Sequence, residues 1–203
     1  MISRIPKFLR LIAGKECEFH IPTKEKIIYL TFDDGPVPEV TPKVLDILKR
    51  HNAKATFFCV GDNIRKYPEL YKILLDEGHN VGNHTMHHLQ GLKTSFSDYM
   101  KDVEQSAELC SSNLFRPPYG RISKRQKQEL LKRNFRLIFW SVISFDYSKK
   151  ISQEKCLKNS LKLHSGDIIL FHDSLKAEKN MLYALERVLL FYSEKGFRFC
   201  AIR

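Results

Sequence analysis

Short apolar runs alternate with amphipathic segments along most of the chain. The runs have the composition of buried strands, and polar or turn-forming residues separate them. They lie at residues 26–32, 55–60, 80–83, 114–116, 136–142, 167–172 and 197–202. Between them, apolar residues recur three or four positions apart, as at Val44, Ile47 and Leu48, which predicts helices. The chain is therefore expected to alternate strand and helix.

This alternation predicts the fold class. Strands that alternate with helices form a parallel sheet covered on both faces, because a parallel neighbour needs a crossover connection. Continuous apolar runs agree with strands buried on both faces. About seven such strands fit an α/β fold with a distorted or incomplete (β/α) barrel better than an open sheet. We expect one catalytic domain over residues 25–203, with residues 1–24 as an N-terminal extension packed on or near it.

Charge and cysteine content narrow the partners and the compartment. The formal net charge of +11 attracts anionic surfaces, but no basic motif interleaved with aromatic residues is present, so no nucleic-acid partner is expected. The five cysteines include no C-x-x-C pair. Neither a disulfide framework nor a zinc-thiolate site is therefore indicated, and a reducing compartment is favoured. The pattern carries no signal for an oligomeric state.

The first thirteen residues are basic and partly apolar. Lys7 and Arg10 interrupt the apolar stretch that a secretion signal needs, and no run approaches the roughly 18 apolar residues of a membrane span. The expected location is cytoplasmic or membrane-peripheral. The segment either packs as a helix on the domain or lies as an interfacial helix, with weak association to an anionic membrane or the cell envelope.

Polar side chains follow five of the predicted strands. In parallel α/β folds the reacting groups lie at the carboxyl ends of the strands. One such residue alone is more often a helix cap or an ordinary surface group. Together they favour a single site on one rim of the fold. The residues at these strand ends are Asp33, Asp34, His84, His88, Arg116, Asp146 and His172.

Two of these strand ends suggest a metal site with its own base. The adjacent carboxylates of Asp33 and Asp34 repel each other, so such a pair usually uses one carboxylate to hold a cation and leaves the other for proton transfer. His84 and His88 are four positions apart and would share one face if the segment turns helically. Two imidazoles and one carboxylate suit a divalent metal ion, with Zn²⁺ expected and Co²⁺, Ni²⁺ or Mn²⁺ as alternatives. His87 is expected to point elsewhere.

Five motifs in order resemble those of the polysaccharide deacetylases, carbohydrate esterase family 4, which share the NodB-homology domain. They read TFDDGP, HTMHH, RPPYG, WSVISFDY and LFH, and they extend over residues 31–172. The resemblance implies a distorted (β/α) barrel. It also implies a metal-dependent hydrolase that removes N-acetyl groups from an acetylated oligo- or polysaccharide such as chitooligosaccharide or peptidoglycan, by attack of an activated water.

The resemblance also assigns roles to the metal and base side of the site. Asp34, His84 and His88 would hold the metal ion, which lowers the pKa of a water and polarises the acetamide carbonyl. Asp33 would act as the general base. Arg116 would hold and tune Asp33 through its opposite charge.

Further residues receive roles on the leaving-group side. By the same resemblance, the backbone N–H of Tyr119 would help to bind the oxyanion, and His172 would protonate the leaving amine. Asp146 would raise the pKa of His172 and set its tautomer. The expected substrate pocket contains Leu170, Pro118 and Tyr147.

Substrate identity stays open at this point. Tyr147 stands where the family commonly has a tryptophan, so the wall of the pocket is expected to differ. Trp140 is expected to pack rather than to contact substrate. Two alternatives to the glycan N-deacetylase remain: a hydrolase of a non-sugar amide or an O-acetyl ester, and a non-catalytic glycan-binding module on the same fold. Intact Asp33 and His172 argue against the binding module, because binding alone needs neither a base nor an acid.

Overall fold

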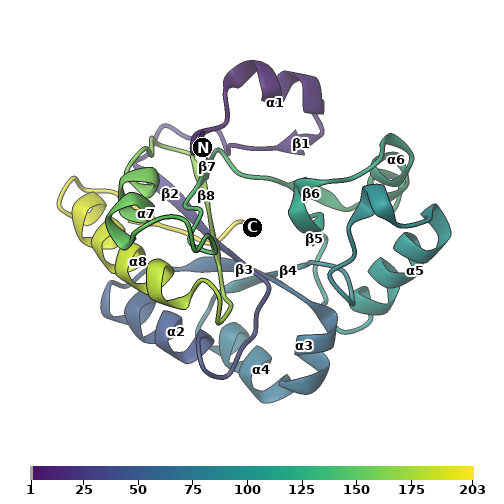
Figure 1. Ribbon diagram of the computed structural model, residues 1–203, viewed down its shortest axis with the longest axis horizontal. Coiled ribbons are helices and arrows are strands. Elements are labelled where there is room, and N and C mark those ends of the chain that lie inside the picture. Colours follow the sequence, from purple (N-terminus) through teal and green to yellow (C-terminus); the bar gives the residue numbers. More distant parts are fainter. Residues whose placement is uncertain (1) are drawn as a thin grey trace.

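The computed structural model describes residues 2–203, in which an outer layer of helices surrounds a curved sheet (Figure 1). The strands are β1 (Cys17–Glu18), β2 (Ile27–Asp33), β3 (Ala55–Cys59), β4 (Asn80–Asn83), β5 (Leu114–Phe115), β6 (Arg136–Ile138), β7 (Val142–Ile143), β8 (Ile168–His172) and β9 (Arg198–Phe199). The α-helices are α1 (Lys7–Ala13), α2 (Thr41–Arg50), α3 (Gly61–Lys66), α4 (Pro68–Asp76), α5 (Phe96–Ala107), α6 (Lys124–Lys132), α7 (Gln153–Ser160) and α8 (Glu178–Ser193). Two short 3₁₀ turns are η1 (Gly91–Lys93) and η2 (Pro118–Gly120).

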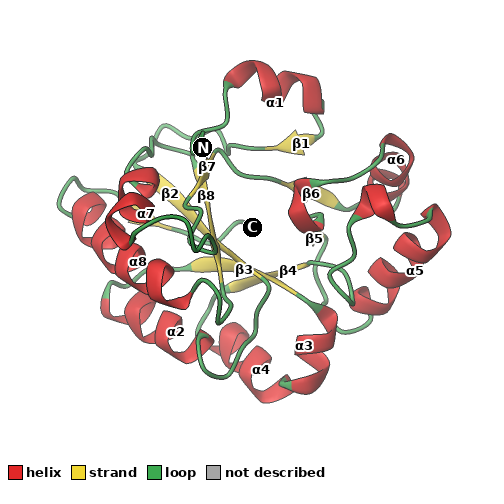
Figure 2. Ribbon diagram, viewed as in Figure 1, coloured by secondary structure: helices red, strands yellow, loops and turns green. Residues whose placement is uncertain are grey.

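The sheet is an open, all-parallel barrel. Its order is β1-β6-β5-β4-β3-β2-β8-β7, with β9 paired to β2. Figure 2 shows the strands inside and the helices outside, which is the arrangement that crossover helices impose on parallel strands. The predicted α/β class with an incomplete barrel is therefore confirmed.

Two details of the strand prediction differ from the structure. The short β1 was not predicted. The run at residues 136–142 is two strands, because β6 pairs with β1 and β5 whereas β7 pairs with β8 at the other end of the sheet. The chain thus crosses the opening of the barrel within this one apolar run. In the described residues, the sheet has a path of eight strands with β9 added beside β2, instead of the about seven strands predicted.

The N-terminal extension is hydrogen-bonded to the sheet. The amide of Ile5 donates to the carbonyl of Ser141 at 2.9 Å, and the amide of Ile143 donates to the carbonyl of Ser3 at 2.8 Å. Arg4 also pairs with buried Asp167. These contacts place residues 3–5 against β7, while the extension supplies β1 to the opposite edge. The domain boundary at residue 24 stays a prediction.

Helix α1 lies outside the ring of helices that covers the sheet (Figure 1). Phe8, Leu9 and Ile12 on it are exposed. None of the helices within residues 2–203 has the length and apolarity to cross a bilayer. Weak association of this segment with an anionic membrane or the envelope stays a prediction.

Two apolar layers fix the barrel. Outside the sheet, Phe32 stacks between Phe57 and Phe171 at ring-centroid distances of 5.0 and 5.8 Å, facing the helices. Inside, Phe58 and Ile202 belong to a smaller buried cluster that fills the barrel. Alternate residues of a strand face opposite sides, so the neighbours of the outward phenylalanines point into the barrel. All five cysteines are free thiols, as expected.

The C-terminal residues plug the barrel at the end away from the polar strand ends. Ile202 is fully buried, and its amide donates to Thr56 Oγ1 at 2.8 Å near the start of β3. Figure 1 shows the C-terminus inside the ring of strands. Because this apolar plug closes the end of the barrel where the strands begin, the end where the strands finish is available for polar groups.

Ile202→Ala should lower the free energy of unfolding by about 2–5 kcal/mol, because it empties a buried site that neighbouring strands cannot collapse into. Urea denaturation followed by circular dichroism measures this change. Leu190→Ala on α8 is the control, since Leu190 is half exposed. An equal loss in the two variants would contradict the plug.

Candidate active site

The parallel register brings the predicted site residues to one rim. Asp33 at the end of β2 lies beside His172 at the end of β8. On the other side of β2, the sheet continues through β3 and β4 to β5, and Arg116 lies in the turn directly after β5. Asp33 and His172 follow the outward-facing Phe32 and Phe171, so their side chains face the barrel interior. The strand pattern alone therefore aims both groups at the same space.

Asp34, His84 and His88 form a cluster that fits a metal ion. One potential ligand atom from each lies within 4.8 Å of the others. The Nε2 atom of His88 is 3.3 Å from Asp34 Oδ1, and Nε2 of His84 is 3.8 Å from the same oxygen. The donor set and spacing match a two-histidine, one-carboxylate site with open coordination positions.

Hydrogen bonding and charge suit these three side chains to a cation. Nδ1 of His84 donates to the carbonyl of Arg116 at 2.7 Å, which leaves Nε2 with its lone pair toward Asp34. Burial lowers the pKa of His84 to about 4, so the imidazole is neutral at pH 7. Burial opposes the charged form of Asp34, but the adjacent His88 imidazole and the other histidines lower the pKa of Asp34 to about 2. These are the protonation states that a cation requires.

The segment that carries the two histidines is a loop, so the helical turn that would have placed both rings on one face is not formed. Thr85 and His88 adopt left-handed conformations, with φ of 64° and 57°. Buried Asp102 on α5 stabilises this loop by accepting from the amides of Met86 and His87, at 2.8 and 3.0 Å. Sequence reasoning missed Asp102, because only the tertiary structure brings α5 beneath the loop.

His87 points away from the cluster, as expected. Its Nδ1 is 2.6 Å from Asp102 Oδ1. The left-handed turns on either side of His87 separate its ring from those of His84 and His88, whose centroids are 5.1 Å apart.

Asp33 and Arg116 form a buried ion pair beside the metal-type cluster. Nη1 of Arg116 donates to Asp33 Oδ1 at 2.7 Å and to Thr31 Oγ1 at 2.8 Å. Nε of Arg116 also donates to the carbonyl of Ile138 at 3.1 Å, and Nη2 donates to the carbonyl of Phe139 at 2.9 Å. The guanidinium of Arg116 thus fixes Asp33 Oδ1, while Asp33 Oδ2 lies 3.7 Å from His84 Nε2. The carboxylate predicted as the base is thus fixed with one oxygen free toward the pocket.

His172 and Asp146 form the second polar pair. Nδ1 of His172 is 2.8 Å from Asp146 Oδ1, and the His172 amide donates to Asp146 Oδ2 at 2.7 Å. Burial disfavours the imidazolium, but the Asp146 carboxylate outweighs it and raises the pKa of His172 to about 9. A protonated His172 with its Nε2 free is the arrangement that the predicted general acid needs.

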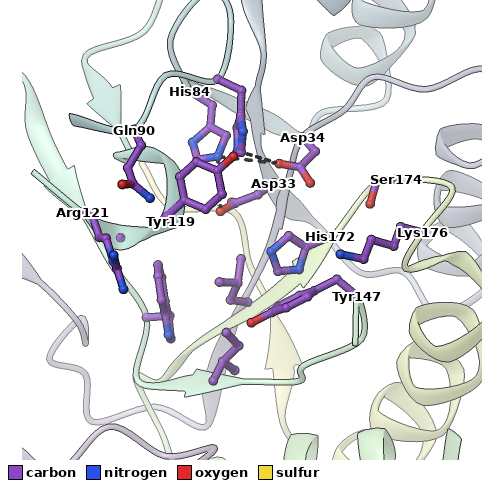
Figure 3. A pocket seen from close by; sticks show the side chains of 15 residues that line it. Asp33, Asp34, His84, Gln90, Tyr119, Arg121, Tyr147, His172, Ser174 and Lys176 are labelled. Carbon is purple, nitrogen blue, oxygen red and sulfur yellow. Dashed lines mark ion pairs between the residues drawn. The ribbon is translucent and has the colours of Figure 1, made fainter. Parts of the chain in front are cut away.

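A pocket of about 560 Å³ opens between these groups (Figure 3). Leu170 and Tyr147 line it, as predicted, and the Tyr147 ring meets the His172 ring edge-on at 4.8 Å. Pro118 does not line it among the described residues; it is buried and begins η2. Trp140 was expected only to pack, yet it forms part of the wall. Further lining residues that sequence reasoning missed are Gln90, Gly120, Arg121, Ile143, Ser174 and Lys176.

Tyr119 contributes its backbone rather than a buried side chain. Its φ is 62°, and its ring is exposed against the His88 ring at a centroid distance of 4.7 Å. The next two amides, of Gly120 and Arg121, donate to carbonyls of η2 and its neighbour. Within residues 2–203, no hydrogen bond uses the Tyr119 amide itself. This N–H is therefore available to an oxyanion, as the predicted role requires.

Asp173 is a further buried carboxyl at this rim, to which sequence reasoning assigned no role. Its amide donates to the carbonyl of Asp33 at 2.7 Å, and Thr41 Oγ1 donates to its Oδ2 at 2.6 Å. Burial raises the pKa of Asp173 to about 7. A Cβ on Gly35 would lie 2.1 Å from Asp173 Oδ2, so the carboxyl fills the space beside the turn that carries Asp34.

The chain belongs to the polysaccharide deacetylase family. The family model described as polysaccharide deacetylase matches residues 20–138. A peptidoglycan-N-acetylglucosamine deacetylase from Bacillus cereus is 35% identical over 192 residues, covering 91% of this chain and 70% of that protein. The predicted family and enzyme class are therefore confirmed.

Further relatives agree in sequence and structure. The peptidoglycan-N-acetylmuramic acid deacetylase PdaA from Bacillus subtilis is 34% identical over 194 residues, covering 89% of this chain and 71% of that protein. The crystal structure of the Bc1960 peptidoglycan N-acetylglucosamine deacetylase is similar with a TM-score of 0.86 and 32% identity, over 98% of this chain and 95% of that one. The open barrel is thus the fold of this family.

Gly35→Ala should weaken the predicted binding of Zn²⁺ by roughly tenfold, because the new methyl group must displace Asp173 or the turn that carries Asp34. Competition with a chelating dye measures the affinity. The double variant Gly35→Ala/Asp173→Ala removes the clashing oxygen and should recover part of the loss. Strictly additive effects in this double-mutant cycle would contradict the steric coupling.

The pair of His172 and Asp146 predicts an alkaline limb in the pH profile. The imidazolium is present below its raised pKa and is lost as the pH rises through about 9, so kcat/KM should fall there. Asp146→Asn removes the charge that raises this pKa and should move the limb to lower pH. Asp76→Asn on exposed α4 is the control. An unmoved limb in Asp146→Asn would exclude His172 as the titrating acid.

Proposed function

We propose that the protein removes N-acetyl groups from the amino sugars of peptidoglycan in a reaction that depends on a divalent metal ion, with Zn²⁺ as the expected ion. One observation carries the proposal: a metal-type cluster, a separate carboxylate and a histidine with a raised pKa converge on one pocket. Amide hydrolysis needs these three groups together. The named activities of the relatives support the choice of peptidoglycan.

The residues fit the metal ion by their chemistry. Asp34, His84 and His88 would hold it, since their donor atoms converge and the His84 tautomer leaves Nε2 free. When bound, such an ion acidifies water and polarises the acetyl carbonyl. Proton transfer and binding of the oxyanion are carried out by side chains and a backbone amide of this chain.

Asp33 removes a proton from the attacking water. Its Oδ1 stays bound to Arg116 throughout, so Oδ2 is the atom that accepts the proton. As the acetamide carbonyl becomes tetrahedral, the Tyr119 amide donates to the developing oxyanion. The fixed guanidinium of Arg116 keeps Asp33 from rotating while the water attacks.

His172 then completes the cleavage. Its Nε2 gives a proton to the amide nitrogen as the C–N bond breaks, and Asp146 stabilises the imidazolium until that moment. Acetate and the free amino sugar are the products. Exchange with solvent then removes the proton from Asp33 and restores the charge of His172.

Leu170 and Tyr147 bear on the alternative substrates. Leu170 offers an apolar wall near His172 that suits an acetyl methyl group, and Tyr147 offers a phenol in place of an indole. A non-sugar amide or an O-acetyl ester would fit the same catalytic groups. Sugar-bearing substrates are favoured because the pocket is an open hollow of about 560 Å³ rather than a closed cavity for a small amide.

The test is acetate release from peptidoglycan and from N-acetylglucosamine oligosaccharides by zinc-loaded protein. Asp33→Asn should lower kcat by roughly 10²–10⁴-fold with its zinc content intact, because only proton transfer is removed. Chelation should abolish the activity, and added Zn²⁺ should restore it.

Asp46→Asn is the matched control, since Asp46 is an exposed aspartate on α2. It should retain wild-type rates. If wild-type protein releases acetate from O-acetyl esters or small amides but from neither glycan, the proposed substrate class is wrong. If Asp33→Asn keeps full activity, the proposed base is wrong.

A further inference from the structure

A second hollow opens beside the catalytic pocket. It has a volume of about 470 Å³, and Gly120 and Arg121 line both hollows. We call it the side hollow; the end of α1, η1 and the start of α6 form its walls. Figure 3 shows Arg121 across the catalytic pocket from Lys176. The two hollows together make an extended depression, as a polymeric substrate requires.

Positive charge dominates the side hollow. Arg121, Lys124 and Lys127 line it, and no aspartate or glutamate of the described chain does. Lys127 is already engaged, 2.9 Å from the carbonyl of Ala13 and 3.6 Å from a carboxylate oxygen of Glu16. Arg121 and Lys124 are exposed, and within residues 2–203 their side chains make no ion pair or hydrogen bond. Two positive charges are therefore free for a ligand.

Apolar side chains lie next to these charges. Ile12 and Leu92 line the side hollow and are 77% and 60% exposed. A neutral sugar offers these two cations hydroxyl and ether oxygens but no opposite charge. A substituent that joins a carboxylate to a short hydrocarbon, such as an ether-linked lactyl group or the acidic peptide attached to it, would use both kinds of wall.

The backbone at Gly120 connects the side hollow to the reaction. Gly120 has φ of 63°, and a Cβ there would lie 2.7 Å from the ring of Trp140. The backbone at Gly120 therefore packs closely against the Trp140 ring in the pocket wall. This backbone lies between the two hollows and directly follows Tyr119, whose amide is the proposed oxyanion donor. Because Gly120 and Arg121 line both hollows, a sugar in the catalytic pocket and a substituent of its neighbour in the side hollow fit one substrate molecule.

We propose that the side hollow binds a carboxylate-bearing substituent on the sugar that neighbours the one being deacetylated, through Arg121 and Lys124. The proposal rests on the proposed function and deepens it. It makes the enzyme selective for an acidic glycan that contains N-acetylmuramic acid units over a neutral polymer of N-acetylglucosamine.

The test compares three glycans of equal length with zinc-loaded full-length protein: a neutral N-acetylglucosamine oligosaccharide, a peptidoglycan fragment with free muramic carboxylates, and the same fragment with those carboxylates amidated. Wild-type protein should prefer the acidic fragment, with a lower KM that rises with salt. Arg121→Gln/Lys124→Gln should lower the acidic-to-neutral ratio of kcat/KM roughly tenfold, mainly through KM. Lys124→Gln alone should lower it roughly threefold.

Lys132→Gln is the matched control, because Lys132 is exposed on the same helix α6 but does not line the hollow. It should keep the wild-type ratio. Equal turnover of the free and amidated fragments, or an unchanged ratio in the double variant, overturns the inference while the proposed function stands. Absence of acetate from all three glycans overturns the proposed function itself, and the inference with it.

Discussion

The buried guanidinium of Arg116 is the contact on which the site depends. It binds Asp33 and Thr31 of β2 and the carbonyls of Ile138 and Phe139, while the backbone carbonyl of Arg116 accepts from His84. One residue thus links the ends of three separate strands and orients both the predicted base and a predicted metal ligand. Loss of Arg116 would leave Asp33 as an unpaired buried charge, which is among the most destabilising changes a core can suffer.

This ion pair is better explained by function than by stability. Burying two charges costs about as much as their attraction returns, and an apolar pair of similar size is often as stable. The same rim carries other unfavourable features. Asp34, Thr85 and Tyr119 hold left-handed conformations at φ of 84°, 64° and 62°, each at a cost of about 1–3 kcal/mol. The apolar layers around the sheet, including the stacked phenylalanines of β2, β3 and β8, stabilise the barrel enough to keep these features in place.

Much of the site could be predicted because strand ends are readable in sequence. Apolar runs mark the strands, and parallel topology brings their carboxyl ends together, so the sequence pattern alone places Asp33 and His172 on one rim. Asp102 and Asp173 could not be found in this way. Asp102 acts across a gap of 15 residues or more on the histidine loop, and nothing in its own helix marks it. Asp173 follows His172, but its contact with the turn at Gly35 exists only in the packed protein.

The sequence by itself determined the alternation of strand and helix, the order of the motifs and the chemical types at the strand ends, because these depend on local pattern. The tertiary structure decided what depends on distant segments: the split of residues 136–142 across the barrel opening, the loop rather than helix at residues 84–88, and the side hollow between α1 and α6. The paired aspartates show both levels. That they are adjacent is a local fact, but the tertiary structure gives them different partners: Asp34 lies beside His88, and Asp33 pairs with Arg116 from the turn after β5.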